Sequence, residues 1–133
     1  MSTEGMKHDQ DKLRYDLIGE HAQRELVAVL TYGAIKYEAG NWRTVSDAQE
    51  RYYGALLRHL SAYRIQQQSS LDGADSVDEE SGLSHLAHAL CCLHFLLQIE
   101  SFQNKDAFDE RFENAMKKAH ELRAARMEKE AAK

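Results

Sequence analysis

The fold of this chain is decided by residues 78–97, whose sequence is DEESGLSHLAHALCCLHFLL. Acidic residues open the stretch, and the part from residue 89 to 97 is apolar nearly all round. A helix that is apolar on every side is enclosed by its neighbours. We therefore expect a helix over residues 78–101, covered on both faces by other helices or by a second subunit. The leucines that repeat along it with helical spacing are Leu83, Leu86, Leu90, Leu93 and Leu97.

Three further segments, at residues 20–38, 46–67 and 105–130, show the same helical period. Proline is absent, and several of the seven glycines fall where these helices would begin or end. The expected fold class is all-α: a single-domain bundle of about four helices. In this prediction an N-terminal arm over residues 1–19 precedes the bundle, and residues 105–133 form a charged C-terminal helix.

Composition and charge limit the classes of function. The 133 residues suit one domain, and a net charge of -5 with an isoelectric point near 5.8 predicts no broad basic surface for nucleic acid or lipid. The N-terminus lacks the apolar core of a signal peptide, and no apolar run reaches the roughly 18 residues of a membrane span. Cys91 and Cys92 lie in an apolar run, as is typical of free thiols in a reducing compartment. We expect a cytoplasmic protein.

The acidic residues Asp78, Glu79 and Glu80 have two interpretations. Carboxylates in the first turn of a helix are favoured by its dipole, which is a purely structural role. Carboxylates are also the ligands that Mg²⁺ takes in proteins, usually together with substrate phosphates. The sequence leaves both interpretations open.

Three histidines accompany these acids. On a continuous helix, Asp78 would project close to His85, and Ser81 close to His88. His59 lies on the face of the second helix that should be buried, and antiparallel packing of the two helices would turn it toward His85 and His88. Either these are hydrogen-bonded core histidines, or they form a polar pocket that binds a metal ion between facing helices.

Two other groups of residues could bind a nucleotide. Lys7, Asp9, Lys12 and Arg14 form either a solvated charged arm or a lid that grips phosphates. Tyr32 and Lys36 share one helix edge, and Asn41 and Trp42 follow in a loop. Trp42 either covers the core or stacks on a nucleobase whose edge Asn41 would recognise.

Several catalytic motifs are missing. The chain contains no HExxH or CxxC pattern for zinc and no glycine-rich loop of the GxGxxG or GxxxxGK[ST] type for phosphates. No Ser–His–Asp arrangement follows from the sequence.

Four stretches of the chain together resemble a known family. They are GMKHDQDKLRYDLI at 5–18, VLTYGAIKYEAGNWR at 29–43, RYYGALLRHLSAY at 51–63 and the opening stretch at 78–97. In this order they resemble the phage dATP/dGTP diphosphohydrolases of the MazZ type, from viruses that use 2-aminoadenine in their DNA. The resemblance implies kinship with the MazG-like all-α NTP pyrophosphohydrolases.

The resemblance also implies an activity. Such enzymes cut a nucleoside triphosphate between the α- and β-phosphates, require Mg²⁺ or Mn²⁺, and form homo-oligomers, so we expect a homodimer or homotetramer. The substrates would be dGTP and dATP, and the dGMP formed would feed synthesis of the altered nucleotide. This chain departs from the EExxE and ExxD metal motifs of the MazG-like group, since His59, His85 and His88 stand near those positions.

The residue roles expected from this resemblance are therefore specific to this chain. Glu80 and His85 are the expected catalytic residues. The expected metal ligands are Asp78, Glu80, His59, His85 and His88. The expected substrate-binding residues are Lys7, Asp9, Lys12, Arg14, Tyr32, Lys36, Asn41, Trp42 and Arg58.

Two alternatives remain open from the sequence. One is a metal-dependent phosphohydrolase that uses the histidines as its main ligands and releases nucleoside and triphosphate. The other is a helical interaction protein without catalytic activity.

Overall fold

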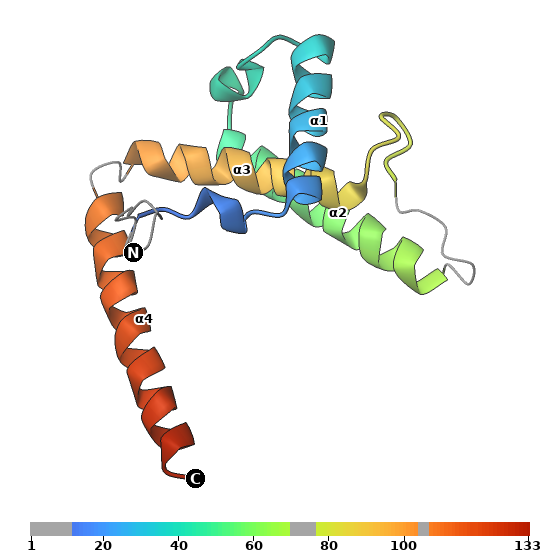
Figure 1. Ribbon diagram of the computed structural model, residues 1–133. Coiled ribbons are helices and arrows are strands. Elements are labelled where there is room, and N and C mark those ends of the chain that lie inside the picture. The colour runs from blue at the N-terminus through green and yellow to red at the C-terminus, as the bar shows by residue number, and fades with distance from the viewer. Residues whose placement is uncertain (1–11, 70–76, 104–106) are drawn as a thin grey trace, which may run out of the picture. The chain divides into compact units, whose positions relative to one another are not determined.

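The computed structural model describes residues 12–69, 77–103 and 107–133, and within them the regular structure is helical apart from an isolated bridge between Val77 and Ser84. This confirms the all-α prediction (Figure 1). No helix among the described residues is long and apolar enough to cross a membrane. In chain order the elements are η1 (Tyr15–Leu17), α1 (Glu20–Lys36), η2 (Asn41–Thr44), α2 (Ala48–Ser69), α3 (His85–Gln103) and α4 (Phe108–Ala131).

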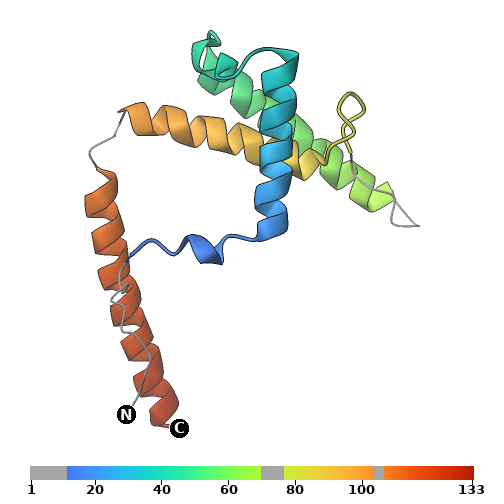
Figure 2. The same cartoon turned by 45° about the horizontal axis from the view of Figure 1, so that its top comes forward.

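The chain divides into two compact units. One is Ile18–Gln103, in which α2 and α3 lie side by side in opposite directions and α1 crosses α3 (Figures 1 and 2). The described part of the other comprises residues 12–17 and 107–133, and within its α4 the rings of Phe108 and Phe112 stack with centroids 6.0 Å apart. The single-domain organisation stays a prediction.

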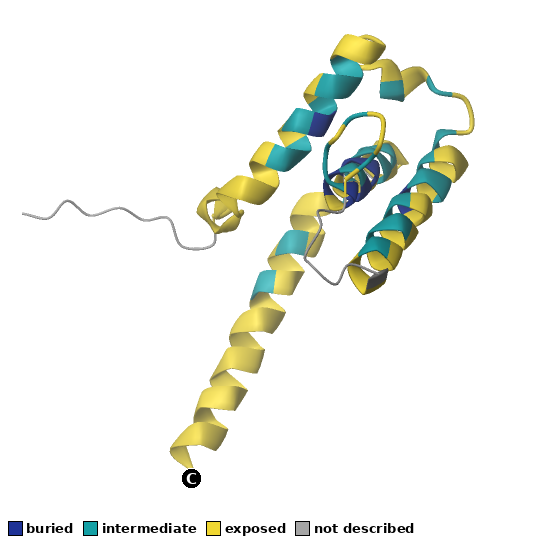
Figure 3. Ribbon diagram, turned by 90° about the vertical axis from the view of Figure 1, so that its right-hand side faces the viewer, coloured by how far each residue is buried: buried dark blue, intermediate teal, exposed yellow. Residues whose placement is uncertain are grey.

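Helix α3 carries most of the buried residues of the first unit (Figure 3). Its Ala87 and Cys91 pack with Val29 of α1. Its Ala89 and Cys92 pack against α2. The adjacent cysteines thus point into different helix interfaces, as their positions on a helix predict. Because the residues along both interfaces are small, the helix backbones can approach closely.

The leucine stripe of α3, which consists of Leu86, Leu90, Leu93 and Leu97, lies outside these interfaces. Leu86, Leu90, Leu93 and Leu97 are between 37% and 66% exposed, and Leu83 alone packs on the first core cluster. The expectation that both faces of this helix are covered is therefore not met within the described chain. The prediction that a second subunit covers the stripe stays untested.

The predicted start of the third helix is wrong. The helix begins at His85, and the residues from Asp78 to Ser84 form a closed loop instead. The Asp78 N–H donates to the Leu83 carbonyl at 2.8 Å, and the Gly82 N–H donates to the Asp78 carbonyl at 2.8 Å. Gly82 has a φ of 73°, a left-handed conformation that only glycine adopts without cost. The acids therefore lie beside the helix entrance rather than in its first turn.

Candidate functional site

Three histidines meet where α2 and α3 pack together. The Nδ1 atoms of His59 on α2 and His85 on α3 are 3.0 Å apart. The ring of His88, one turn further along α3, stacks on His59 with centroids 4.6 Å apart and planes 10° from parallel. The sequence predicted that these imidazoles face one another, and the structure brings them together.

This meeting follows from the faces of the two helices. His85 begins the face of α3 that continues with Ala89 and Cys92, and this face packs on Leu56 of α2. His59 follows Leu56 at a spacing of three residues and therefore lies on the same side of α2. The histidines thus form the polar end of an otherwise apolar contact between α2 and α3.

The loop before α3 adds a carboxylate and a hydroxyl to the histidines. The Ser81 hydroxyl lies 2.8 Å from His88 Nε2, and the Ser81 N–H donates to Asp78 Oδ2 at 2.9 Å. The same Asp78 oxygen is 3.9 Å from His88 Nε2. The sequence predicted that Asp78 and Ser81 lie on the side of His85 and His88. The prediction assumed a continuous helix, whereas in the structure a loop closed at Gly82 brings them there.

The surroundings set the protonation of the cluster at neutral pH. Burial lowers the pKa of His59, and the neighbouring His88 and His85 lower it further. Burial also lowers the pKa of His88, against the opposing effect of Asp78. For Asp78, burial acts to raise the pKa, but hydrogen bonds from Ser81 and the nearby histidines outweigh it, so the pKa is lowered. The site therefore presents a carboxylate and two imidazoles with their basic lone pairs.

Three of the five predicted metal ligands are spaced to share one ion. Donor atoms of His59, Asp78 and His85 all lie within 4.8 Å of one another. His88 instead contacts Ser81, and Glu80 forms an ion pair with Lys36. A site of two imidazoles and a carboxylate fits a divalent cation by its donor chemistry.

Lys36 and Glu80 join the end of α1 to the loop before α3. The hydrogen bond from Lys36 lowers the pKa of Glu80, and the same bond raises the pKa of Lys36. Partial desolvation and the Glu80 carboxylate raise the pKa of the nearby Tyr32. Two predicted substrate-binding residues, Lys36 and Tyr32, are thereby placed beside a predicted ligand.

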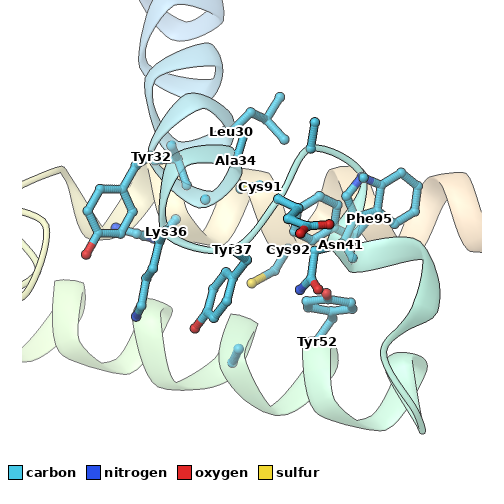
Figure 4. A pocket seen from close by; sticks show the side chains of 18 of the residues that line it. Leu30, Tyr32, Ala34, Lys36, Tyr37, Asn41, Tyr52, Cys91, Cys92 and Phe95 are labelled. Carbon is cyan, nitrogen blue, oxygen red and sulfur yellow. The ribbon is translucent and has the colours of Figure 1, made fainter.

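A cavity of about 510 Å³ connects this charged region with an aromatic one. His59, Asp78, Glu80 and His88 are among the residues that line it. Figure 4 shows Tyr32 and Lys36 on one side of the cavity, with Tyr37 between them and the aromatic side. The residues labelled on the aromatic side are Asn41, Tyr52 and Phe95.

Trp42 has a packing role as well as a place in the cavity wall. Its indole stacks on Phe95 with ring centroids 4.9 Å apart, and the Arg43 guanidinium lies 5.2 Å from its centre. The His94 ring lies T-shaped to the indole, with ring centroids 6.0 Å apart. The interpretation of Trp42 as a cover over the core is therefore supported, and its position in the lining keeps the nucleobase interpretation open.

Other predicted substrate-binding residues do not line the cavity. Lys12 and Arg14 belong to the other unit, where Arg14 forms an ion pair with Asp16 at 2.7 Å. Arg58 is exposed on α2 and is not part of the lining. Lys7 and Asp9 lie outside the described residues. Their roles stay predictions.

The sequence did not identify all the residues that shape the cavity. Tyr37, Tyr52 and Phe95 supply much of its aromatic wall, and Cys91 and Cys92 form part of its floor. Tyr37 and Tyr52 continue the buried faces of α1 and α2 near η2, so they follow a core pattern in the sequence. That pattern does not reveal that these residues also line a cavity.

The chain is similar to known proteins over most of its length. The profile of the family described as dATP/dGTP diphosphohydrolase, N-terminal, matches residues 2–111. A curated protein of Salmonella phage PMBT28, named dATP/dGTP diphosphohydrolase, is 32% identical over 107 residues, which are 80% of this chain and 33% of that protein. The chain thus spans about a third of the length of this relative. No solved structure gives a significant match.

Proposed function

Because the chain belongs to the family of dATP/dGTP diphosphohydrolase N-terminal domains, we propose that it hydrolyses dGTP, and also dATP, to the monophosphate and pyrophosphate. The observation that carries the proposal is the cavity with an aromatic side and a side of carboxylates, imidazoles and Lys36. A nucleotide also has two parts: a base that stacks on aromatic rings, and an anionic phosphate chain that binds a lysine and a divalent cation.

The aromatic side suits a purine. Tyr37, Tyr52 and Trp42 offer flat apolar surface, and base–aromatic stacking contributes about 1–3 kcal/mol for each base. Asn41 stands beside them and carries both a donor and an acceptor, which a base edge can satisfy. We propose that these residues hold the base, with the choice between guanine and adenine decided by hydrogen bonds to its edge.

The charged side suits the phosphates and a divalent cation. His59, Asp78 and His85 would hold the cation, for which the family resemblance implies Mg²⁺ or Mn²⁺. A bound divalent cation supplies charge stabilisation and a more acidic bound water. Lys36 would turn from Glu80 to a phosphate oxygen, which places its charge where negative charge accumulates during phosphoryl transfer.

We assign proton handling to Glu80 and His85. Glu80 is 60% exposed in its side chain and would be released as a base when Lys36 engages substrate. Its role as a catalytic residue, and that of His85, stay proposals. Ser81 positions both His88 and Asp78 through hydrogen bonds and so fixes the cluster in one arrangement.

The wider role is proposed from the family resemblance. We propose that the dGMP formed feeds the synthesis of a 2-aminoadenine nucleotide in the cytoplasm of a phage-infected host. The exposed leucine stripe of α3 supports assembly into a homodimer or homotetramer, since large exposed apolar faces mark protein contacts. Kinship with the MazG-like group also stays a proposal.

A nucleotide panel tests the proposal. The full chain is incubated with each of the four deoxynucleoside triphosphates in Mn²⁺ or Mg²⁺, and products are separated by anion-exchange chromatography. We expect dGMP and pyrophosphate in equal amounts with Mn²⁺, a slower reaction with dATP, and no reaction with excess chelator. Release of single phosphate, or no product from any nucleotide, would refute the proposal, and the latter would favour the non-catalytic interaction protein.

One observation favours a second candidate reaction. The cluster contains two imidazoles for each carboxylate, which differs from the all-carboxylate sites expected of the MazG-like group. The alternative is a phosphohydrolase that releases nucleoside and intact triphosphate. The same chromatogram separates the two, because triphosphate and pyrophosphate elute apart.

A further inference from the structure

We propose that His59, Asp78 and His85 form a site that selects a transition-metal ion, such as Mn²⁺, Co²⁺ or Zn²⁺, and discriminates against Mg²⁺. The inference rests on the proposed function only in placing the cation at the edge of the cavity that His59 and Asp78 line. It deepens that function by naming the chemical class of the cation from the donor atoms.

The two imidazoles are close enough for a hydrogen bond between them in the metal-free chain, and the same spacing suits two ligands on one ion. His59 Nδ1 and His85 Nδ1 are 3.0 Å apart. Two metal–nitrogen bonds of about 2.1 Å place their nitrogens about 3.0 Å apart at the right angle of a six-coordinate ion and about 3.4 Å apart at a tetrahedral angle, so small shifts of the rings accommodate either geometry. An oxygen of Asp78 completes a group whose donor atoms all lie within 4.8 Å of one another. The cluster therefore offers two nitrogens and one oxygen to a common centre.

Neighbouring groups hold these ligands in place. His59 is stacked on the ring of His88, and Asp78 accepts a hydrogen bond of 2.9 Å from the Ser81 N–H. His85 is only 8% exposed, so its packing restricts the ring. Ligands oriented by surrounding contacts are typical of metal sites. Within the described part of the chain, this group alone combines three such donors at this spacing.

The donor set decides between classes of cation. Mg²⁺ takes oxygen ligands and keeps several of its waters, so imidazole nitrogens contribute little to its binding. Imidazole suits Zn²⁺ and the other late first-row ions, and affinity rises from Mn²⁺ to Co²⁺. Glu80, a second carboxylate that lines the cavity, is ion-paired with Lys36, which leaves Asp78 as the carboxylate of the cluster. We infer weak binding of Mg²⁺ and firm binding of Co²⁺ or Zn²⁺.

Cobalt binding tests this without any turnover. The metal-free full chain is titrated with Co²⁺, and its visible absorption and the heat of binding are recorded, with Mg²⁺ and Zn²⁺ as competitors. We expect one site per chain, displacement of Co²⁺ by Zn²⁺, and no displacement by an equal concentration of Mg²⁺. The variants His59→Gln, His85→Gln and Asp78→Asn should each raise the dissociation constant for Co²⁺ by at least about tenfold.

The control is His21→Gln, which changes an exposed histidine of α1 that contacts Glu25 and lies outside the cluster. It should bind Co²⁺ as the unchanged protein does. Circular dichroism identifies variants that fail to fold, and the half-buried positions 59 and 78 keep the test informative if His85→Gln is lost. Displacement by equal Mg²⁺, or unchanged affinity in folded His59→Gln and Asp78→Asn, would overturn the inference. Cobalt binding without nucleotide hydrolysis would instead refute only the proposed function.

Discussion

Lys36, the last residue of α1, forms an ion pair with Glu80 in the loop that precedes α3. The pair joins α1 to this loop a second time, since Leu83 of the loop also packs on the core cluster that includes Val29 of α1. Both side chains line the cavity, so each is placed to exchange its partner for a component of the substrate.

We predict that Lys36→Met lowers kcat/KM for dGTP by about 10- to 100-fold, since hydrogen bonds to charged groups carry energies of this order. Stability should change little, because exposed ion pairs contribute little to folding. Steady-state kinetics and thermal unfolding measure the two effects. Lys117→Met removes an exposed lysine of α4 and is the matched control. Equal losses in both variants would contradict a role for Lys36 in binding phosphate.

Gly82→Ala should destabilise the protein by about 1 kcal/mol, because a side chain raises the energy of a left-handed backbone. Apart from Gly82 and its chain neighbours, no atom of the described residues lies within 4 Å of the position that the added methyl group would take, so the cost is conformational. Urea unfolding measures it. Gly40 also has a positive φ and open space around it, and Gly40→Ala should cost a similar amount. Gly82→Ala should in addition weaken Co²⁺ binding, because Asp78 lies in the loop that Gly82 closes; unaltered binding would contradict that link.

Acidification should destabilise the metal-free protein before its carboxylates titrate. The pKa values of His59 and His88 in the folded protein lie below the ordinary value of 6.5. Between these lowered values and about pH 6.5, the unfolded chain therefore binds more protons than the folded one. Their contribution to stability is complete above about pH 6.5 and is lost as the pH falls through the folded values. Unfolding midpoints in urea between pH 8 and 5, with chelator present, measure the slope. His59→Gln should flatten it, and an unchanged slope would count against the burial of that imidazole.

The two cysteines should resist alkylation in the native protein. Burial raises the pKa of Cys91 to about 12, and burial also raises that of Cys92. The reactive thiolate is therefore scarce at pH 8. Mass spectrometry after iodoacetamide should show no adduct in the folded chain and two in urea. Rapid native modification of either thiol would indicate that the α3 interfaces open readily.

The helices could be predicted because their leucine and aromatic residues repeat with helical spacing. The loop at Asp78 could not, although the Ser81–Gly82 pair is a turn signal. The helical spacing of the leucines begins at Leu83, directly after the loop, and the carboxylates of residues 78–80 suit a helix start. What decides the outcome is a set of hydrogen bonds around Asp78, which periodicity does not encode.

The histidine cluster could be predicted in outline for a simple reason. His59 lies on the face of its helix that the pattern predicts to be buried, and antiparallel packing of α2 and α3 turns it toward His85 and His88. The sequence could not tell which of the nearby acids joins them. Asp78 does so because the Ser81 N–H holds it inward, whereas Glu80 turns to Lys36.

The neighbouring cysteines of α3 have a mechanical consequence. Cys91 fits against α1 and Cys92 against α2, so the helix is seated in two grooves at once. If α3 rotated about its axis, a larger leucine would replace a cysteine in one interface and the other interface would lose its packing. The small residues of the two interfaces therefore favour one rotation of α3 about its axis, which also sets the direction of His85 and His88 at its start.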